Sequence, residues 1–298
     1  MNAINRGYLK HYAMLVPFFA FFLVFFVVPI VSTVVLSFTR WDGIRRPEFV
    51  SLRHYANLAS DPKFHRGAAN IGMFLLIVIP VGITASIVLA MLVNDLKMRG
   101  ADVFRGIYFF PVVIPLFLSA SIFRYIFNPQ VGIVDLLFNA LSIPRIGWLT
   151  TPPFTVVSVA IVDMWRAIAF NFLFLYAGIQ GVPSEYYEAA RIDGASLLQQ
   201  KWYVTLPQLE PIIFLVIVNG FIGGLQVFDI PWLISHSQYA NYGGPSGGML
   251  FPVVEIVASA WGRQEFGSAS AYAVVLLIVA LVVTGVQFGI RSARHYDD

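Results

Sequence analysis

The chain has no cysteine among its 298 residues, and only 12% of them are charged. The missing thiols exclude disulfide bonds, thiolate metal ligands and cysteine nucleophiles, and they do not decide the compartment. The formal net charge is only +3, without a basic run or tail, which argues against nucleic acid as a partner. By contrast, 58% of the residues are hydrophobic and the mean hydropathy is +0.75. Too little polar surface remains to cover a water-soluble globule, so we expect the chain to contact lipid.

Six apolar runs reach the roughly 20 residues that a helix needs to cross about 30 Å of hydrocarbon. They lie at residues 14–38, 68–93, 107–127, 154–179, 212–234 and 271–290. The first run is too long for a signal peptide and has no small-residue cleavage site, so it is interpreted as a retained span. The sequence therefore predicts an all-α, multi-pass membrane protein with a single transmembrane domain over residues 1–298. Six spans put both termini on one side, but Lys and Arg divide nine to eight between the two sides and do not decide which.

Two connecting segments have the spacing of surface helices. Leu52, Tyr55 and Leu58 recur at helical intervals between Pro47 and Pro62. An amphipathic stretch from Ile133 to Leu141 is similarly bounded by Gly and Pro. We expect a short helix in each segment. The sequence shows neither an internal repeat nor a second domain.

The stretch SEYYEAARIDGASLLQQKWYVTLPQLEP, residues 184–211, contains six charged residues between two apolar runs. Ser184 is expected to cap a first helix, and Asp193-Gly194 to end it with glycine in the left-handed region. Ser196 is expected to begin a second short helix that ends at Pro207. Small side chains near the bend would let another protein approach the backbone closely. From these residues alone, an ordinary amphipathic connector at the lipid interface remains an equal alternative.

The sequence EAARIDGA followed by VTLP resembles the EAA signature of permease subunits in binding-protein-dependent ABC importers. The matching residues, at unbroken spacing, are Glu188, Ala189, Ala190, Gly194, Val204, Leu206 and Pro207. The stretches FFVVPIVSTVVLSFTRWDG, SLRHYANLASDPKF, FRGIYFFPVVIP and FDIPWLI with GGP resemble the carbohydrate-uptake branch of that family. This resemblance implies the six-helix fold of a type I ABC importer permease.

The resemblance also implies a role for residues 181–210, called the EAA loop below. In that family the loop forms cytoplasmic coupling helices seated in a groove of an ATPase. The coupling residues expected here are Glu188, Ala189, Ala190, Asp193, Gly194, Ala195, Leu206 and Pro207. The chain departs from the family pattern at Lys201, Trp202 and Tyr203, where Phe followed by basic residues is usual. This departure leaves open which ATPase the loop accepts.

By the same resemblance, the chain is a non-enzymatic permease subunit of an ATP-driven importer for a carbohydrate or related polar solute. Its implied partners are a second permease, giving a heterodimer, two ATPases that bind ATP and Mg, and an extracytoplasmic solute-binding protein. The implied location is the cytoplasmic membrane of a bacterium or archaeon, with both termini in the cytoplasm. A secondary transporter or channel subunit is the alternative, although no inverted repeat is visible.

Motifs for chemistry within the chain itself are weak. The sequence contains no Gly-x-x-x-x-Gly-Lys-Ser/Thr, and its five histidines are not paired at metal-ligand spacing. Residues 244–248 formally fit G-x-S-x-G, but a nucleophile elbow needs a strand before it and a helix after it. We therefore expect no catalytic residue, cofactor or metal in this chain.

Polar residues inside the fourth and fifth apolar runs mark the expected solute path, because a charge at the bilayer centre costs roughly 2.5–3.5 kcal/mol. They are Asp163, Arg166, Asn171, Asn219, Gln226 and Asp229. Asp163 and Arg166 are spaced to pair on one helix face, and such a pair suits either a path or a structural lock.

Other residues of these runs have alternative interpretations. Gly220 and Gly224 form Gly-x-x-x-Gly, which favours close helix packing over a ligand contact. Four aromatic residues near the polar face are candidates for stacking on a sugar ring: Trp165, Tyr176, Phe228 and Trp232. Arg124 or Arg166 would suit an anionic solute only if it faces the cavity.

Overall fold

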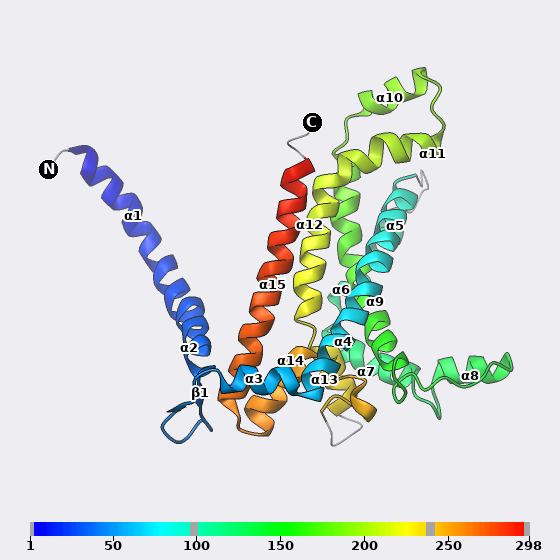
Figure 1. Ribbon diagram of the computed structural model, residues 1–298. Coiled ribbons are helices and arrows are strands. Elements are labelled where there is room, and N and C mark those ends of the chain that lie inside the picture. The colour runs from blue at the N-terminus through cyan, green and yellow to red at the C-terminus, as the bar shows by residue number, and fades with distance from the viewer. Residues whose placement is uncertain (1–2, 96–100, 237–241, 295–298) are drawn as a thin grey trace. The chain divides into compact units, whose positions relative to one another are not determined.

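The computed structural model describes residues 3–95, 101–236 and 242–294, and most of them are helical (Figure 1). Five described segments are long and apolar enough to cross a membrane: Met14–Leu36, Pro62–Asp95, Phe154–Gln180, Leu197–Ser235 and Phe266–Ala293. A bent pair, Gly106–Val113 with Leu116–Ile126, gives a sixth span if it is counted as one. The predicted all-α membrane fold is confirmed.

The third apolar run differs from the continuous span expected over residues 107–127. It contains α6 (Ala101–Val113) and α7 (Leu116–Ile126), and the two apolar segments meet at a bend of 102°. Proline has no backbone N–H and disfavours helical dihedrals in the residue before it. Pro115, at the break, has ψ 139°, which is outside the helical region. The proline therefore ends one helix and starts the next in a new direction.

The chain divides into two compact units, residues 1–61 with 256–278 and residues 62–255 with 279–298. The first unit contains α1 (Ala3–Phe22), η1 (Leu23–Val27), α2 (Val28–Leu36), α3 (Arg53–Ser60) and η5 (Ala258–Gly262). It also contains a small antiparallel hairpin of β1 (Thr39–Arg40) and β2 (Glu48–Phe49), which the sequence did not predict. The surface helix expected between Pro47 and Pro62 is α3.

The hairpin of the first unit packs against the start of α15 (Phe266–Arg294). The Phe266 backbone N–H donates to the Trp41 carbonyl at 3.1 Å, and the two rings lie 5.4 Å apart. Gly267 follows, and a Cβ at this position would overlap the Thr39 carbonyl oxygen. The same oxygen lies 3.0 Å from Nε2 of His54 in α3. Only a residue without a side chain fits this contact.

The second unit contains most of the remaining helices. In chain order they are α4 (Pro62–Ile77), η2 (Val78–Gly82), α5 (Ile83–Asp95), α6, α7, α8 (Ile133–Ala140), α9 (Phe154–Gln180), α10 (Ser184–Ile192), α11 (Leu197–Gln200), η3 (Lys201–Thr205), α12 (Leu206–Leu225), α13 (Asp229–His236), η4 (Pro245–Gly247) and α14 (Pro252–Val257), whose last two residues belong to the first unit. The helix α8 is the one expected from Ile133 to Leu141. Helices α5, α9 and α12 pack around a buried core that includes Val93, Phe172 and Leu209. Helices α10 and α11 lie at one end of this bundle, and α8 and α13 lie at the other (Figure 1).

The segment around η4 is fixed by side chains of two helices. Asn70 of α4 donates its amide hydrogens to the carbonyls of Gly247 and Leu250, at 2.9 and 2.8 Å. The Thr155 hydroxyl of α9 donates to the Gly248 carbonyl at 3.1 Å. Residues 244–248 thus form a short 3₁₀ turn between irregular segments, without the strand and helix that a nucleophile elbow requires.

Candidate functional site

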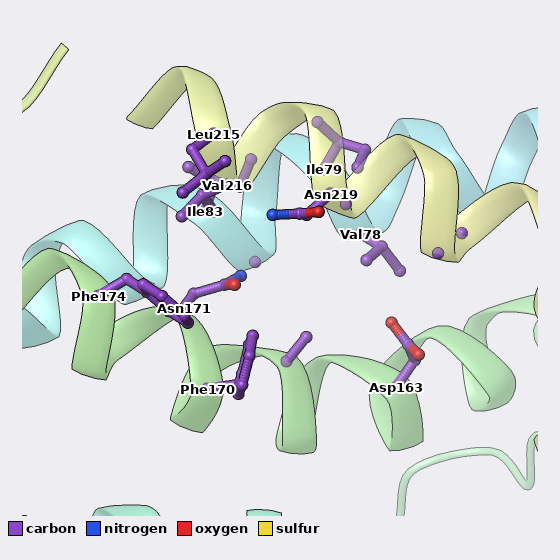
Figure 2. A pocket seen from close by; sticks show the side chains of 15 residues that line it. Val78, Ile79, Ile83, Asp163, Phe170, Asn171, Phe174, Leu215, Val216 and Asn219 are labelled. Atoms are coloured by element: carbon purple, nitrogen blue, oxygen red, sulfur yellow. The ribbon is translucent and has the colours of Figure 1, made fainter. Parts of the chain in front are cut away.

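A cavity of about 250 Å³ lies among three helical segments of the second unit. Its walls come from η2 with the start of α5, from α9 and from α12. Asp163 and Asn171 of α9 and Asn219 of α12 are its polar lining residues. Figure 2 shows Asn171 and Asn219 extending from their helices into the space between them, with Asp163 further along α9. The structure therefore brings together three of the six residues expected along the path.

The cavity face of α9 follows the helical repeat. From Asp163, the lining residues of this helix are four, seven, eight and eleven positions further on: Ala167, Phe170, Asn171 and Phe174. This spacing places them along one side of a helix. Phe170 and Phe174, whose rings lie 5.0 Å apart, were not singled out in the sequence. The helical repeat that starts at Asp163 could have predicted that both residues line the cavity.

The other three expected path residues do not line this cavity. Arg166 makes no hydrogen bond or ion pair with Asp163 in the part of the chain that the structure describes, and its buried Nε atom has no hydrogen-bond partner there. No direct ion pair therefore joins Asp163 and Arg166, which are one helical turn apart. Gln226 is the exposed C-cap of α12, and Asp229 is exposed at the start of α13, beyond the end of the cavity wall. Arg124 is also outside the lining.

The aromatic residues proposed for sugar stacking pack elsewhere. Trp165 contacts Phe123 edge-on at 5.4 Å, and Tyr176 stacks on Phe172 at 5.6 Å. The Trp232 ring lies between Phe228, at 5.2 Å, and Tyr242, at 5.0 Å. None of these candidates lines the cavity, where Phe170 and Phe174 are the aromatic wall.

The Gly-x-x-x-Gly pair allows α12 to approach its neighbours closely. A Cβ at Gly220 would lie 2.9 Å from the Ile79 Cδ1 atom, and one at Gly224 would overlap the Leu75 side chain. The packing role favoured from the sequence is confirmed by these contacts. Both glycines also line the cavity, so the close contact sets its width.

The bend of the EAA loop forms as its residues predict. Helix α10 ends at Ile192 with Asp193 as its C-cap, and Gly194 follows with φ +81°. The Ala195 N–H donates to the Ala190 carbonyl at 2.9 Å, which closes the turn. Ser196 then caps α11 in a capping box with Gln199, whose side-chain oxygen accepts the Ser196 N–H at 2.8 Å. One detail is corrected: the N-cap of α10 is Pro183, and Ser184 is the first helical residue.

The second helix of the loop does not end at Pro207. Segments α11, η3 and α12 follow without a break from Leu197 to Leu225, and Pro207 lies in the first turn of α12. Because the segments before it are already helical, Pro207 lacks a backbone N–H that a continuous helix would use. The preceding η3 is π-helical, so the hydrogen-bond register changes just before the proline. The second helix of the loop is thus continuous with the fifth span.

The EAA loop has an exposed surface with a strong apolar component. Five of the predicted coupling residues are exposed, and the other three are half-buried; the exposed ones are Glu188, Ala189, Asp193, Gly194 and Pro207. Large apolar side chains surround them, including Ile192, which is 86% exposed, and Tyr203, which is 78% exposed. Apolar groups gathered in this way mark a surface for contact with protein or membrane.

The comparisons with known proteins now identify the chain. Residues 82–292 match the family of binding-protein-dependent transport system inner membrane components. The chain belongs to this family. It is a multi-pass membrane permease of the ABC importer kind, which decides against the alternative of a secondary transporter or channel subunit.

Relatives match the permease over nearly its whole length. The probable ABC transporter permease protein YurN of Bacillus subtilis is 31% identical, covering 95% of this chain and 96% of the relative. The trehalose/maltose transport system permease protein MalF of Thermococcus litoralis is 28% identical, covering 95% and 94%. The multiple sugar-binding transport system permease protein MsmF of Streptococcus mutans is 31% identical, covering 92% and 91%.

Solved structures show the same fold. A chain of a bacterial ABC transporter involved in the import of the acidic polysaccharide alginate matches with a TM-score of 0.82 at 22% identity, over 96% of each chain. The alginate transporter in complex with a pentasaccharide-bound periplasmic protein matches with a TM-score of 0.81 at 21% identity, over 95% of this chain and 94% of that one. The predicted type I importer permease fold is confirmed.

Proposed function

We propose that this permease imports a neutral carbohydrate or related polyhydroxylated solute, driven by ATP that partner subunits hydrolyse. The observation that supports this most directly is the arrangement of the second unit. An exposed EAA loop lies at one end of α5, α9 and α12, and the same helices form the walls of a cavity that contains three polar side chains. Relatives named for trehalose/maltose and for multiple sugars support the solute class.

The cavity wall supports a solute without charge. Its polar groups are one carboxyl and two carboxamides, and none of the described residues that line it is Lys or Arg. Carboxamides donate and accept hydrogen bonds, as sugar hydroxyls require. A carboxylate in a poorly screened site would repel an anionic sugar, and no cation in the lining offsets this. Phe170 and Phe174 add apolar area for the faces of a sugar ring.

The EAA loop is proposed to bind the ATPase. Its helices are joined by a capped bend, so they can move as one body. Its exposed apolar residues suit burial against another protein. This assignment places the loop and both termini in the cytoplasm. The partners are then a second permease, two ATPases that hold ATP and Mg, and an extracytoplasmic solute-binding protein. Closure of the ATPases would turn the cavity outward, and hydrolysis would restore the inward-facing state.

This proposal is tested with the assembled transporter and its cognate binding protein. We expect the tagged permease to co-purify with a second permease and an ATPase after mild solubilisation. In thermal-shift screens the binding protein should be stabilised by neutral mono- or oligosaccharides and not by uronic acids. Uptake in proteoliposomes should follow the same order. An ATPase that never co-purifies would contradict the importer assignment, whereas selective uptake of uronic acids would contradict the neutral solute alone.

A further inference from the structure

The last two residues of α5 contact the end of α9, just before the EAA loop, and the returning part of the loop. Gln180, which ends α9 immediately before the loop, donates its amide to the Asn94 side-chain oxygen at 2.6 Å. Lys201, which begins η3 on the returning side, forms an ion pair with Asp95. Two consecutive side chains therefore contact the helix that leads into the loop and the segment that returns from it.

These contacts lie around an open cleft. A cleft of about 540 Å³ separates the end of α5 from the loop, and Asn94, Asp95 and Lys201 are among its lining residues. On the loop side, the hydroxyls of Tyr187 and Thr205 lie 3.0 Å apart and join α10 to η3. Since the cleft leaves this region loosely packed, polar side-chain contacts provide much of the connection between α5 and the loop.

The other end of the same helix borders the solute cavity. Gly82 and Ile83, at the junction of η2 and α5, line it together with Val78 and Ile79. Helix α5 has 13 residues, about 20 Å of continuous helix. It packs on α9 through buried Ala90 and Val93 near its far end. A displacement of Asp95 would therefore reach the cavity wall through one helix and its π-helical junction.

We propose that Asn94 and Asp95 form a clamp that transmits movement of the EAA loop through α5 to the cavity wall. The clamp rests on the proposed function and makes Asn94, Asp95 and Lys201 positioning residues for coupling. Lys201 is one of the residues at which the chain departs from the usual EAA pattern, and its partner Asp95 gives this departure a physical role.

The ion pair suits a contact that must be remade in every transport cycle. The Lys201 and Asp95 side chains are 27% and 51% exposed, so water screens their attraction. Pairs of this kind shift an equilibrium by up to about fivefold. This is enough to bias two positions of α5 without locking either one.

The absence of cysteine allows a direct test without knowledge of the solute. Asn219→Cys places a thiol on the cavity wall, in a complex with cysteine-free partner subunits. Its reaction rate with a maleimide is measured without nucleotide and after trapping with ATP, Mg²⁺ and vanadate. We expect trapping to change the rate in the parent complex. Asp95→Ala or Lys201→Ala should reduce that change up to about fivefold.

Two controls distinguish a coupling effect from a purely structural one: variants that should restore the Asp95–Lys201 contact, and the loss of a different ion pair. Asp95→Glu and the exchange Asp95→Lys with Lys201→Asp should restore the response. Glu210→Gln removes another ion pair of similar exposure, to Arg291 at 3.6 Å, which joins α12 to α15 and not the loop to α5. It should leave the response unchanged.

An unaltered response in both alanine variants would overturn the clamp, as would failure of the charge exchange to restore it. A parent complex that retains no ATPase, or does not respond to nucleotide, would contradict the proposed function and the clamp with it.

Discussion

Gly194 and Glu188 are two residues of the EAA loop whose substitution should affect partner binding and not folding. Gly194 has φ +81°, yet a Cβ built on it would meet no atom within 4 Å. Glycine is therefore needed at this position for its backbone conformation, and not because a side chain would clash with other residues of the chain. Glu188 is exposed, and its side chain forms no hydrogen bond or ion pair among the described residues. Substitution of either residue should leave the permease folded.

We predict that Gly194→Val and Glu188→Lys abolish uptake and weaken ATPase retention, while pairing with the second permease persists. A β-branched residue in the left-handed region costs about 1–2 kcal/mol, which would shift the bend. The lysine would reverse a charge on the surface that we propose binds the ATPase. Co-purification of each partner is measured beside uptake. Gly194→Asn is the control, because asparagine tolerates positive φ. Normal uptake in Gly194→Val and Glu188→Lys would mean that the loop is only a connector.

Among the elements, α15 differs along its length in whether a glycine can be replaced by a residue with a side chain. At Gly267 a Cβ would overlap the Thr39 carbonyl oxygen of β1, an atom of the backbone that cannot rotate away. At Gly285 and Gly289 of the same helix, a Cβ would meet nothing within 4 Å. The three positions thus test packing within one element.

Gly267→Ala should destabilise the permease by about 1–3 kcal/mol, the usual cost of overpacking. Gly285→Ala should be neutral or stabilise it slightly, because alanine favours helix by up to about 1 kcal/mol over glycine. The measurement is the thermal midpoint of the detergent-solubilised protein, followed by fluorescence-detected size-exclusion chromatography. Equal midpoints for the two variants would show that the contact of α15 with β1 is not needed for stability.

For the whole molecule, the orientation of the chain in the membrane decides whether the EAA loop can reach an ATPase in the cytoplasm. In the second unit, the EAA loop lies at one end of the helices and α13 at the other (Figure 1). Exposed reporter positions are available in both regions, Ile192 in the loop and Ser246 in the 3₁₀ turn that follows α13. Ser51 reports on the segment after the first span.

In intact cells, Ser51→Cys and Ser246→Cys should react with an impermeant maleimide, and Ile192→Cys should not. Permeabilised cells should label Ile192→Cys as well, which controls for accessibility of that thiol. The expected pattern follows from a cytoplasmic EAA loop and six crossings. Labelling of Ile192→Cys from outside would invert the proposed orientation and separate the loop from any cytoplasmic ATPase.

The sequence alone determined the features that depend on local chemistry. Long apolar runs specify membrane helices because hydrocarbon offers the backbone no hydrogen-bond partners. The bend at Gly194 and the cap at Ser196 were predicted because positive φ and N-capping are properties of a few consecutive residues. The EAA spacing, likewise read within one short stretch, indicated the family before any fold was known.

Only the tertiary structure decided which distant residues meet. Six polar residues in two spans looked equivalent, yet the structure placed Asp163, Asn171 and Asn219 in one cavity. Arg166 is on α9 but outside the lining, and Gln226 and Asp229 lie beyond the last residue of α12. Lys201 and Asp95 are 106 positions apart, and Gly267 contacts Thr39 across most of the chain. Such contacts depend on helix rotation, offset and crossing, which result from all the packing at once and which no local pattern records.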